Sequence, residues 1–386
     1  MPPSRWFAVG SAAGSDPGAG ARAAEQALLH DDAKLVVVFS PASEALPALL
    51  QRIRARSGDV PLVGCTTAGE IATGGSREAG VVVAALGGDG FAVRTALGTD
   101  ASRDLRAAGA RAARCFDADE SRPHRALMLL TDGLAGDQQE IVRGAYGVLG
   151  AGVPLVGGCA GDDLQMTRTF QLYGDRVLSD SVLGAGIASD APIGIGVRHG
   201  WRPVGEPMLV TRSGGNRVYT LDDRPALDVY LERLGPAHDS LDEEGLTSIA
   251  LTHPLGLSRP SGEEQVRFIG GGDFEVRSLT CIAEVPQGAL VWIMEGDARS
   301  VLDATDEACQ DSLAALEGHS PLGMLAFDCI ARRSVLGEHR ISAEIDRLAT
   351  SGGGAPVAGF YTYGEIARTR GMRGFHNQTL VVLSIA

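Results

Sequence analysis

Apolar runs alternate with amphipathic segments along most of the chain, and this pattern predicts alternating strands and helices. In three places a strand that ends in a polar residue is followed by a helix and then by a second strand that begins at a proline. The three first strands are predicted at 35–39, 126–130 and 323–327, and the helices after them at 42–57, 137–149 and 338–349. The pattern therefore predicts the same strand–helix–strand unit three times.

A glycine-rich motif recurs where each second strand is predicted. Residues 61–71 are Pro-Leu-Val-Gly-Cys-Thr-Thr-Ala-Gly-Glu-Ile, and 154–163 are Pro-Leu-Val-Gly-Gly-Cys-Ala-Gly-Asp-Asp. A weaker third copy at 356–366 is Pro-Val-Ala-Gly-Phe-Tyr-Thr-Tyr-Gly-Glu-Ile. Each copy carries an acid directly after a glycine turn. Three related α/β units are the simplest account of this repetition.

Further elements are predicted on both sides of each unit. Upstream strands are expected at 6–9, 91–97 and 290–294, upstream helices at 18–29, 102–116 and 299–316, and downstream strands at 80–86, 182–188 and 379–385. Several strands are apolar on both faces, as at 36–38, which is typical of parallel sheets covered by helices. We therefore expect an α/β fold of two domains, built from related strand–helix–strand units with mostly parallel, helix-covered sheets. The glycine-rich motifs then lie at the carboxyl ends of strands, where open α/β sheets bind ligands.

The length of the chain and one interruption of the strand–helix alternation suggest the domain division. A chain of 386 residues suits two domains. The regular alternation is interrupted over 190–285, where short alternating strands are predicted instead. We expect an N-terminal domain over 1–215 and a C-terminal domain over 216–386.

Charge and composition exclude several classes of function. Asp and Glu number 48 against 34 Lys and Arg, so the acidic surface should repel nucleic acid and anionic lipid. No signal peptide and no apolar run of membrane-spanning length is present, and we expect a cytoplasmic protein without membrane contact. The six cysteines form no Cys-x-x-Cys pair and the eight histidines no His-x-x-x-His pair, so no metal site is expected.

Five motifs in order resemble one known family. They are Val-Gly-Cys-Thr-Thr-Ala-Gly-Glu-Ile at 63–71, Gly-Gly-Cys-Ala-Gly-Asp-Asp at 157–163, Arg-Pro-Ala-Leu-Asp-Val-Tyr at 224–230, Gly-Phe-Tyr-Thr-Tyr-Gly-Glu-Ile at 359–366 and Phe-His-Asn-Gln-Thr-Leu at 375–380. Together they resemble the FIST proteins, with their N-terminal and C-terminal FIST domains. The resemblance implies a sensory module that binds small ligands such as amino acids. A branch of the family resembles haem proteins that sense nitric oxide.

The motif turns supply the candidate ligand-binding residues. Carboxylates there suit a ligand ammonium group, and the hydroxyl, amide and aromatic groups nearby suit a small polar ligand. The candidates are Cys65, Thr66, Thr67, Glu70, Cys159, Asp162, Asp163, Tyr361, Tyr363, Glu365 and Asn377. The alternative role for the acids is structural, because carboxylates at such positions also cap helices and tie turns together.

The expected function is small-molecule sensing for intracellular signal transduction, with an amino acid or a similar polar metabolite as ligand and a separate signalling protein as partner. No cofactor and no catalytic residue is expected. One alternative is a haem b gas sensor with His199 or His376 as axial ligand. Another is an enzyme that uses Cys65 or Cys159 as nucleophile beside Glu70 or Asp162. No nucleophile-elbow, phosphate-loop or dinucleotide motif supports the enzyme.

Overall fold

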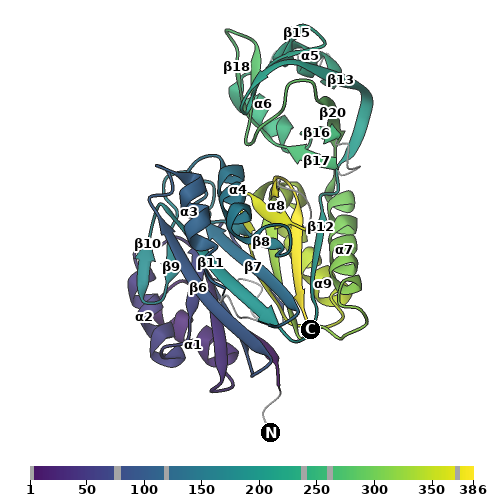
Figure 1. The fold of residues 1–386 in the computed structure, drawn as a ribbon. Helices are drawn as coiled ribbons and strands as arrows, with labels where there is room; N and C mark the ends of the chain where they lie inside the picture. The colour runs from purple at the N-terminus through teal and green to yellow at the C-terminus, as the bar shows by residue number, and fades with distance from the viewer. Residues whose placement is uncertain (1–3, 74–79, 117–120, 236–240, 259–263, 370–373) are drawn as a thin grey trace.

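Three β-sheets with the same strand arrangement form the body of the protein, and a fourth sheet lies beyond one end of it (Figure 1). The structure is a computed structural model that describes residues 4–73, 80–116, 121–235, 241–258, 264–369 and 374–386. No helix within these residues is long and apolar enough to cross a membrane.

The first sheet contains the first copy of the motif. Its strands in spatial order are β1 (Trp6–Ala12), β5 (Val81–Gly87), β2 (Ala33–Ser40), β3 (Leu62–Thr66), β9 (Gln171–Tyr173) and β10 (Arg176–Leu178). Helices α1 (Pro17–Ala27) and α2 (Leu46–Ser57) pack on its outer face through alanine and leucine side chains. The carboxylate of Asp16 starts α1 by accepting hydrogen bonds from the amides of Gly18 and Ala19.

The second and third sheets repeat this arrangement. The second sheet comprises β24 (Phe375–His376), β23 (Glu365–Arg368), β8 (Leu155–Cys159), β7 (His124–Thr131), β11 (Ser181–Ser189) and β6 (Phe91–Thr99), with α3 (Leu105–Ala112) and α4 (Gln138–Leu149) outside. The third comprises β12 (Ile193–Arg198), β25 (Leu380–Ile385), β21 (Gly323–Cys329), β22 (Val357–Thr362) and β4 (Glu70–Ala72), with α7 (Ala298–Ala314), α8 (Ile330–Leu336) and α9 (Glu338–Ser351). The predicted strand–helix–strand core is thus present in each unit.

The prediction of mostly parallel sheets is wrong. Each of the three sheets of the body has a single parallel pair, namely β2–β3, β7–β8 and β21–β22, and their other pairs are antiparallel. The error arose because strands that are apolar on both faces suggest helices on both sides. Here helices cover only the outer faces, and the inner faces of the three sheets pack against one another.

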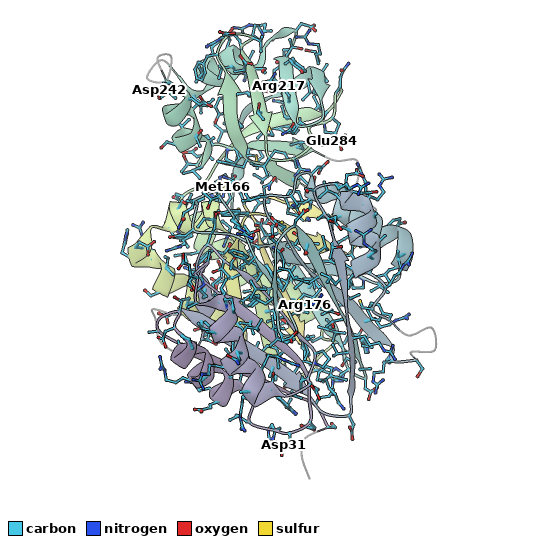
Figure 2. All side chains as sticks on the ribbon, turned by 90° about the vertical axis from the view of Figure 1, so that its left-hand side faces the viewer. Asp31, Met166, Arg176, Arg217, Asp242 and Glu284 are labelled. Carbon is cyan, nitrogen blue, oxygen red and sulfur yellow. The ribbon has the colours of Figure 1, made fainter. Side chains whose placement is uncertain are left out.

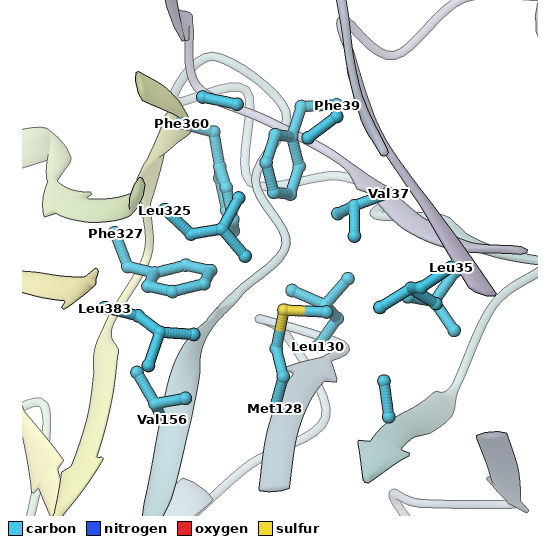
Figure 3. Close-up of a cluster of buried hydrophobic side chains, with 14 of the residues drawn as sticks. Leu35, Val37, Phe39, Met128, Leu130, Val156, Leu325, Phe327, Phe360 and Leu383 are labelled. Carbon is cyan, nitrogen blue, oxygen red and sulfur yellow. The ribbon is translucent and has the colours of Figure 1, made fainter. Parts of the chain in front are cut away.

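The central core is formed by these inner faces (Figure 3). Alternate residues of one strand point to opposite sides, so that Val36 and Val38 face helices while Val37 and Phe39 face the centre. The rings of Phe39 and Phe360, from two different sheets, lie 4.7 Å apart. Figure 3 shows the central cluster with Leu35, Val37, Phe39, Met128, Leu130, Val156, Leu325, Phe327, Phe360 and Leu383.

The three units exchange strands. The segment after the first motif, β4, pairs with β22 of the third sheet. The segment after the second motif, β9, pairs with β3 of the first sheet, and the segment after the third motif, β23, pairs with β8 of the second. Each motif turn therefore lies where the chain crosses from one sheet to another, which brings all three turns to one end of the body.

Residues 202–295, called the insert below, form the fourth sheet. Its strands are β13 (Arg202–Gly214), β14 (Arg217–Leu221), β15 (Arg224–Pro225), β16 (Leu255–Ser258), β17 (Glu264–Arg267), β18 (Ile269–Asp273), β19 (Ser278–Cys281) and β20 (Leu290–Glu295), and its helices are α5 (Ala226–Leu234) and α6 (Glu243–Ala250). The insert has its own apolar core. The strand predicted at 290–294 as the upstream strand of the third unit is β20 and belongs to the insert. The upstream strand of that unit is instead β12, because the insert lies between β12 and α7 in the sequence.

The insert rests on the motif end of the body. Glu284, labelled at its base in Figure 2, lies 3.4 Å from Arg143 of α4. The side-chain amide of Gln378 donates to the carbonyl of Leu251 at 3.0 Å, and Ala283 packs into the core beneath α4. Polar and apolar contacts together hold the insert in place.

Candidate functional site

The three motif turns are joined to one another by backbone hydrogen bonds. The amide of Ala68 donates to the carbonyl of Tyr361 at 3.0 Å, which ties the first turn to the third. The amide of Gly161 donates to Thr66 at 2.9 Å and ties the second turn to the first, while the amide of Tyr363 donates to Cys159 at 3.3 Å and ties the third to the second. The strand-end turns of separate copies thus converge in space.

The repeated glycine of the motif has a steric cause. Gly64, Gly157 and Gly359 occupy the same register position in the three parallel pairs. A Cβ at each would lie 2.3, 1.9 or 2.1 Å from a carbonyl oxygen of the neighbouring strand. Glycine therefore permits the close strand approach that sets the turns in place.

A hollow of about 630 Å³, called the cleft below, opens beside the converged turns. This volume is within the range of small-molecule sites. All three units contribute to its wall, which is lined by Pro41, Ala42, Thr67, Gly69, Glu70, Asp162, Asp163, Gln165, Arg333, Glu338, His339, Ile341, Ser342, Ile345 and Tyr361. Five predicted residues are among them: Thr67, Glu70, Asp162, Asp163 and Tyr361.

Glu70 is the half-buried acid of the first turn. The hydroxyl of Thr67 donates a hydrogen bond to its carboxylate. Burial raises the pKa of Glu70 to about 8, although the hydrogen bond from Thr67 and the nearby positive charge of Arg333 act in the opposite direction. Glu70 therefore holds its proton to a higher pH than an ordinary glutamate does.

Arg333 is the principal residue that the sequence prediction missed. Its guanidinium donates to the carbonyl of Ala68, lies 2.9 Å from Glu338 and 3.4 Å from Asp163, and stands 5.6 Å from the ring centre of Tyr361. It packs close against Gly69, where a Cβ would lie 2.8 Å from Nη1, and the φ of 124° at this position itself favours glycine. The adjacent arginines Arg332 and Arg333, a few residues after a predicted strand end, were the available signal.

Asp162 lines the cleft and also ties its own loop together. Its buried carboxylate accepts hydrogen bonds from the amides of Met166, Thr167 and Arg168 at 2.7–2.9 Å and from the hydroxyl of Tyr363. Burial alone would raise its pKa, but the hydrogen bond from Tyr363 and those from the backbone outweigh it and lower the pKa. Asp162 and Tyr363 thus hold a loop at the edge of the cleft, in which Asp163 is exposed.

Three other predicted residues are buried outside the lining of the cleft. The carboxylate of Glu365 accepts from the hydroxyls of Thr362 and Thr379 at 2.6 and 2.7 Å. The hydroxyl of Thr66 accepts from the amide of Phe170 at 3.0 Å. Asn377 is 2% exposed and lies between β24 and β25. Glu70 and Glu365 thus occupy the same position in the first and third copies of the motif, but only Glu70 reaches the cleft.

The two predicted thiols are buried in the core. Burial raises the pKa of Cys65 and of Cys159, and Cys159 also accepts a hydrogen bond from the hydroxyl of Thr131 at 3.2 Å. All six cysteines are buried and unbridged. A thiolate nucleophile requires the opposite conditions, namely access and a lowered pKa.

The two candidate haem ligands lie apart from the cleft. The ring of His199 accepts from the amide of Trp201 at 3.0 Å, and burial together with Arg332 and Arg198 lowers its pKa to about 4. The Nε2 atom of His376 lies 2.9 Å from the carbonyl of Ala367. Across the described ranges, no cluster of three or more potential metal ligands is found.

These features define a class: an α/β protein whose three related units bring their glycine-rich turns together at the carboxyl ends of parallel strand pairs and jointly line one cleft beside them. The chain belongs to the FIST family, matching the FIST N domain over residues 34–224 and the FIST C domain over 226–368. The resemblance inferred from the motifs is thereby confirmed. FIST domains are associated with sensing in signal transduction.

The chain is also similar to several curated proteins. An uncharacterized protein of Mycobacterium tuberculosis is 32% identical over 243 residues, which cover 59% of this chain and 60% of that protein. An uncharacterized protein of Mycobacterium bovis is 28% identical over 235 residues, covering 59% of each. The chain thus spans about 60% of the length of the mycobacterial relatives that it matches.

Two solved structures show a distant likeness. A chorismatase covers 99% of this chain and 98% of its own at 11% identity, with a TM-score of 0.37. A cyanuric acid hydrolase from A. caulinodans covers 49% of this chain and 72% of its own at 12% identity, with a TM-score of 0.29. At TM-scores this low, neither likeness supports an argument about activity.

Proposed function

We propose that the cleft binds a small polar metabolite and that the protein serves as a ligand-sensing module for a separate signalling protein. The observation that carries this proposal is one hollow of about 630 Å³ that all three units line, through the first two motif turns, Tyr361 of the third motif, and helices α8 and α9. A site shared by three units is suited to sensing, because a ligand that contacts all of them shifts the molecule toward the conformation that it binds best.

The chemistry of the cleft suits an amino acid or a similar zwitterion. Glu70 supplies a carboxyl group whose ionised form pairs with an ammonium group, and Arg333 supplies a cation. Ile341 and Ile345, one turn apart on α9, add an apolar wall for an aliphatic side chain. Opposite charges and an apolar surface in one hollow are the groups that such a ligand requires.

The alternative functions have less support from the described contacts. Neither His199 nor His376 is among the residues of the cleft wall, as a haem ligand facing that hollow would be. Cys65 and Cys159 are buried with raised thiol pKa values. Addition of haem to the purified protein tests the first alternative, since a Soret band that disappears in H199A or H376A would favour it.

The test of the proposed function is calorimetric titration with a panel of amino acids. We expect at least one amino acid to bind the wild type, and Glu70→Gln to weaken that binding at least about tenfold, because an ammonium group loses its charged partner. Since Glu70 must ionise to pair with the ammonium group, affinity should increase as the pH rises towards about 8 and then level off.

The matched control is Glu365→Gln, which changes the same motif position in the third copy. Glu365 is buried outside the cleft lining, so E365Q should bind within about twofold of the wild type. Absence of binding by every panel member, together with no rise of the melting temperature in their presence, would contradict the proposal.

A further inference from the structure

Two neighbouring arginines on α8 have opposite surroundings. Arg332 is fully buried, with Nε 2.6 Å from Asp328 and Nη2 2.9 Å from Glu344. The side chain of Arg333 is 22% exposed and faces the cleft. The partners of Arg332 are fixed inside the protein, whereas those of Arg333 stand at the edge of the hollow.

The guanidinium of Arg333 is positioned by groups that do not depend on the acids around it. The carbonyl of Ala68 accepts from Nη1, and the ring of Tyr361 lies beneath the guanidinium plane. Both groups are buried. The cation therefore remains directed at the cleft when its acidic partners are exchanged.

The acidic partners of Arg333 are exposed and replaceable. The side chains of Glu338 and Asp163 are 80% and 71% exposed, at 2.9 and 3.4 Å from the guanidinium. Ion pairs of this kind are weak because water screens them and both side chains lose freedom. A planar carboxylate that enters the hollow can form paired hydrogen bonds with the same guanidinium.

We infer that Glu338 occupies the place of the ligand's carboxylate before a ligand binds, and that Arg333 exchanges Glu338 for that carboxylate when the ligand binds. This inference rests on the proposed function and assigns roles within the same site. Arg333 selects ligands that carry a carboxylate, and Glu338 acts as an internal competitor that weakens their binding. Because Glu338 is the first residue of α9, the exchange also couples ligand binding to the start of that helix.

The test compares three probes that share an apolar chain: L-leucine, 4-methylpentanoate, which lacks the amine, and 3-methylbutylamine, which lacks the carboxylate. In calorimetric titrations, E338Q should bind the two carboxylates about two- to fivefold more tightly than the wild type. R333Q should lose at least about tenfold in affinity for them, and should not weaken binding of the amine, because the amine makes no ion pair with a guanidinium.

A second measurement does not depend on ligand affinity. An arginine-selective dicarbonyl reagent, followed by mass spectrometry, should modify Arg333 about two- to fivefold faster in E338Q than in the wild type. Buried Arg332 is the internal negative control and should stay unmodified. Asp346→Asn, which removes a charge from an exposed position of α9, is the matched control and should not change the rate at Arg333. L-leucine and 4-methylpentanoate should protect Arg333, and 3-methylbutylamine should not.

The outcomes separate this inference from the proposed function. An equal modification rate in E338Q and the wild type overturns the exchange, as does a carboxylate that binds in the calorimeter without protecting Arg333, and both results leave the cleft as a binding site. Absence of binding by the three probes and by the amino-acid panel overturns the proposed function and, with it, the exchange.

Discussion

At the scale of single residues, Glu70 and Glu365 show how one motif position serves two purposes. Each acid follows a glycine and accepts a hydrogen bond from a threonine three residues earlier, Thr67 or Thr362. Glu70 faces the cleft, whereas Glu365 is enclosed and also bound by Thr379. Burial raises the pKa of both, to about 8 and about 7 respectively. The sequence identified both acids but could not distinguish them, because the difference comes from what packs around each turn.

Glu365 should make the stability of the protein depend on pH. Its pKa of about 7 exceeds the ordinary value of 4.5, so the folded state holds this proton more tightly than the unfolded chain. The stabilisation of the folded state by this proton is therefore complete below about pH 4.5 and is lost as the pH rises through about 7. Between about pH 5 and pH 8 the wild type should lose roughly 2–3 kcal/mol from this group.

Urea unfolding of the wild type and of Glu365→Gln at these two pH values measures the effect. Glutamine cannot ionise, so the free energy of unfolding of E365Q should fall less across this interval, and the difference between the two proteins isolates Glu365 from other titrating groups. An identical pH dependence in both proteins would show that Glu365 has an ordinary pKa.

At the scale of elements, the loop after the second motif depends on one tyrosine of the third. The hydroxyl of Tyr363 accepts from the amide of Leu164 at 2.7 Å and donates to Asp162. Asp163, Leu164 and Met166 have φ values of 54°, 61° and 51°, which are unfavourable for residues with a side chain. The hydrogen bonds of Asp162 and Tyr363 hold this strained backbone, and Figure 2 labels Met166 near the level at which the insert meets the body.

Tyr363→Phe should therefore loosen this loop. Loss of the hydroxyl leaves the amide of Leu164 and the carboxylate of Asp162 with one partner fewer, at a cost of about 0.5–1.5 kcal/mol, because water can reach the exposed amide. Hydrogen exchange at the amides of Leu164, Met166 and Thr167 should become faster. Tyr361→Phe is the control, because its hydroxyl donates instead to Glu344 at 2.9 Å; equal acceleration in both variants would argue against the role of Tyr363.

The sequence predicted the strands and helices themselves better than it predicted which strands pair with one another. The strands and helices of each unit follow from local apolar periodicity, as at β2 and α2, and the structure contains them. The exchange of β4, β9 and β23 between units is a long-range pairing that leaves no local periodicity. For the same reason the cleft-facing residues of α8 and α9 were missed, since Arg333 and Glu338 meet the first turn only after the units assemble.

At the scale of the whole molecule, the insert and the cleft are formed by different parts of the sequence. Every residue that lines the cleft lies outside 202–295. Arg202 and Glu295, at the two ends of the insert, are paired across β13 and β20, so the chain leaves the body and returns to it at neighbouring positions. The body can thus be closed by a short linker in place of the insert.

A variant in which a short glycine–serine linker replaces 202–295 tests whether the body alone holds the ligand site. We expect cooperative unfolding at a lower temperature than in the wild type, because Gln378 loses its contact with Leu251 and the core beneath α4 loses Ala283. Amino-acid affinity should stay within about threefold, since the three turns, α8 and α9 all remain. A loss of binding beyond about tenfold in a body that still unfolds cooperatively would mean that the insert holds the turns in their binding arrangement.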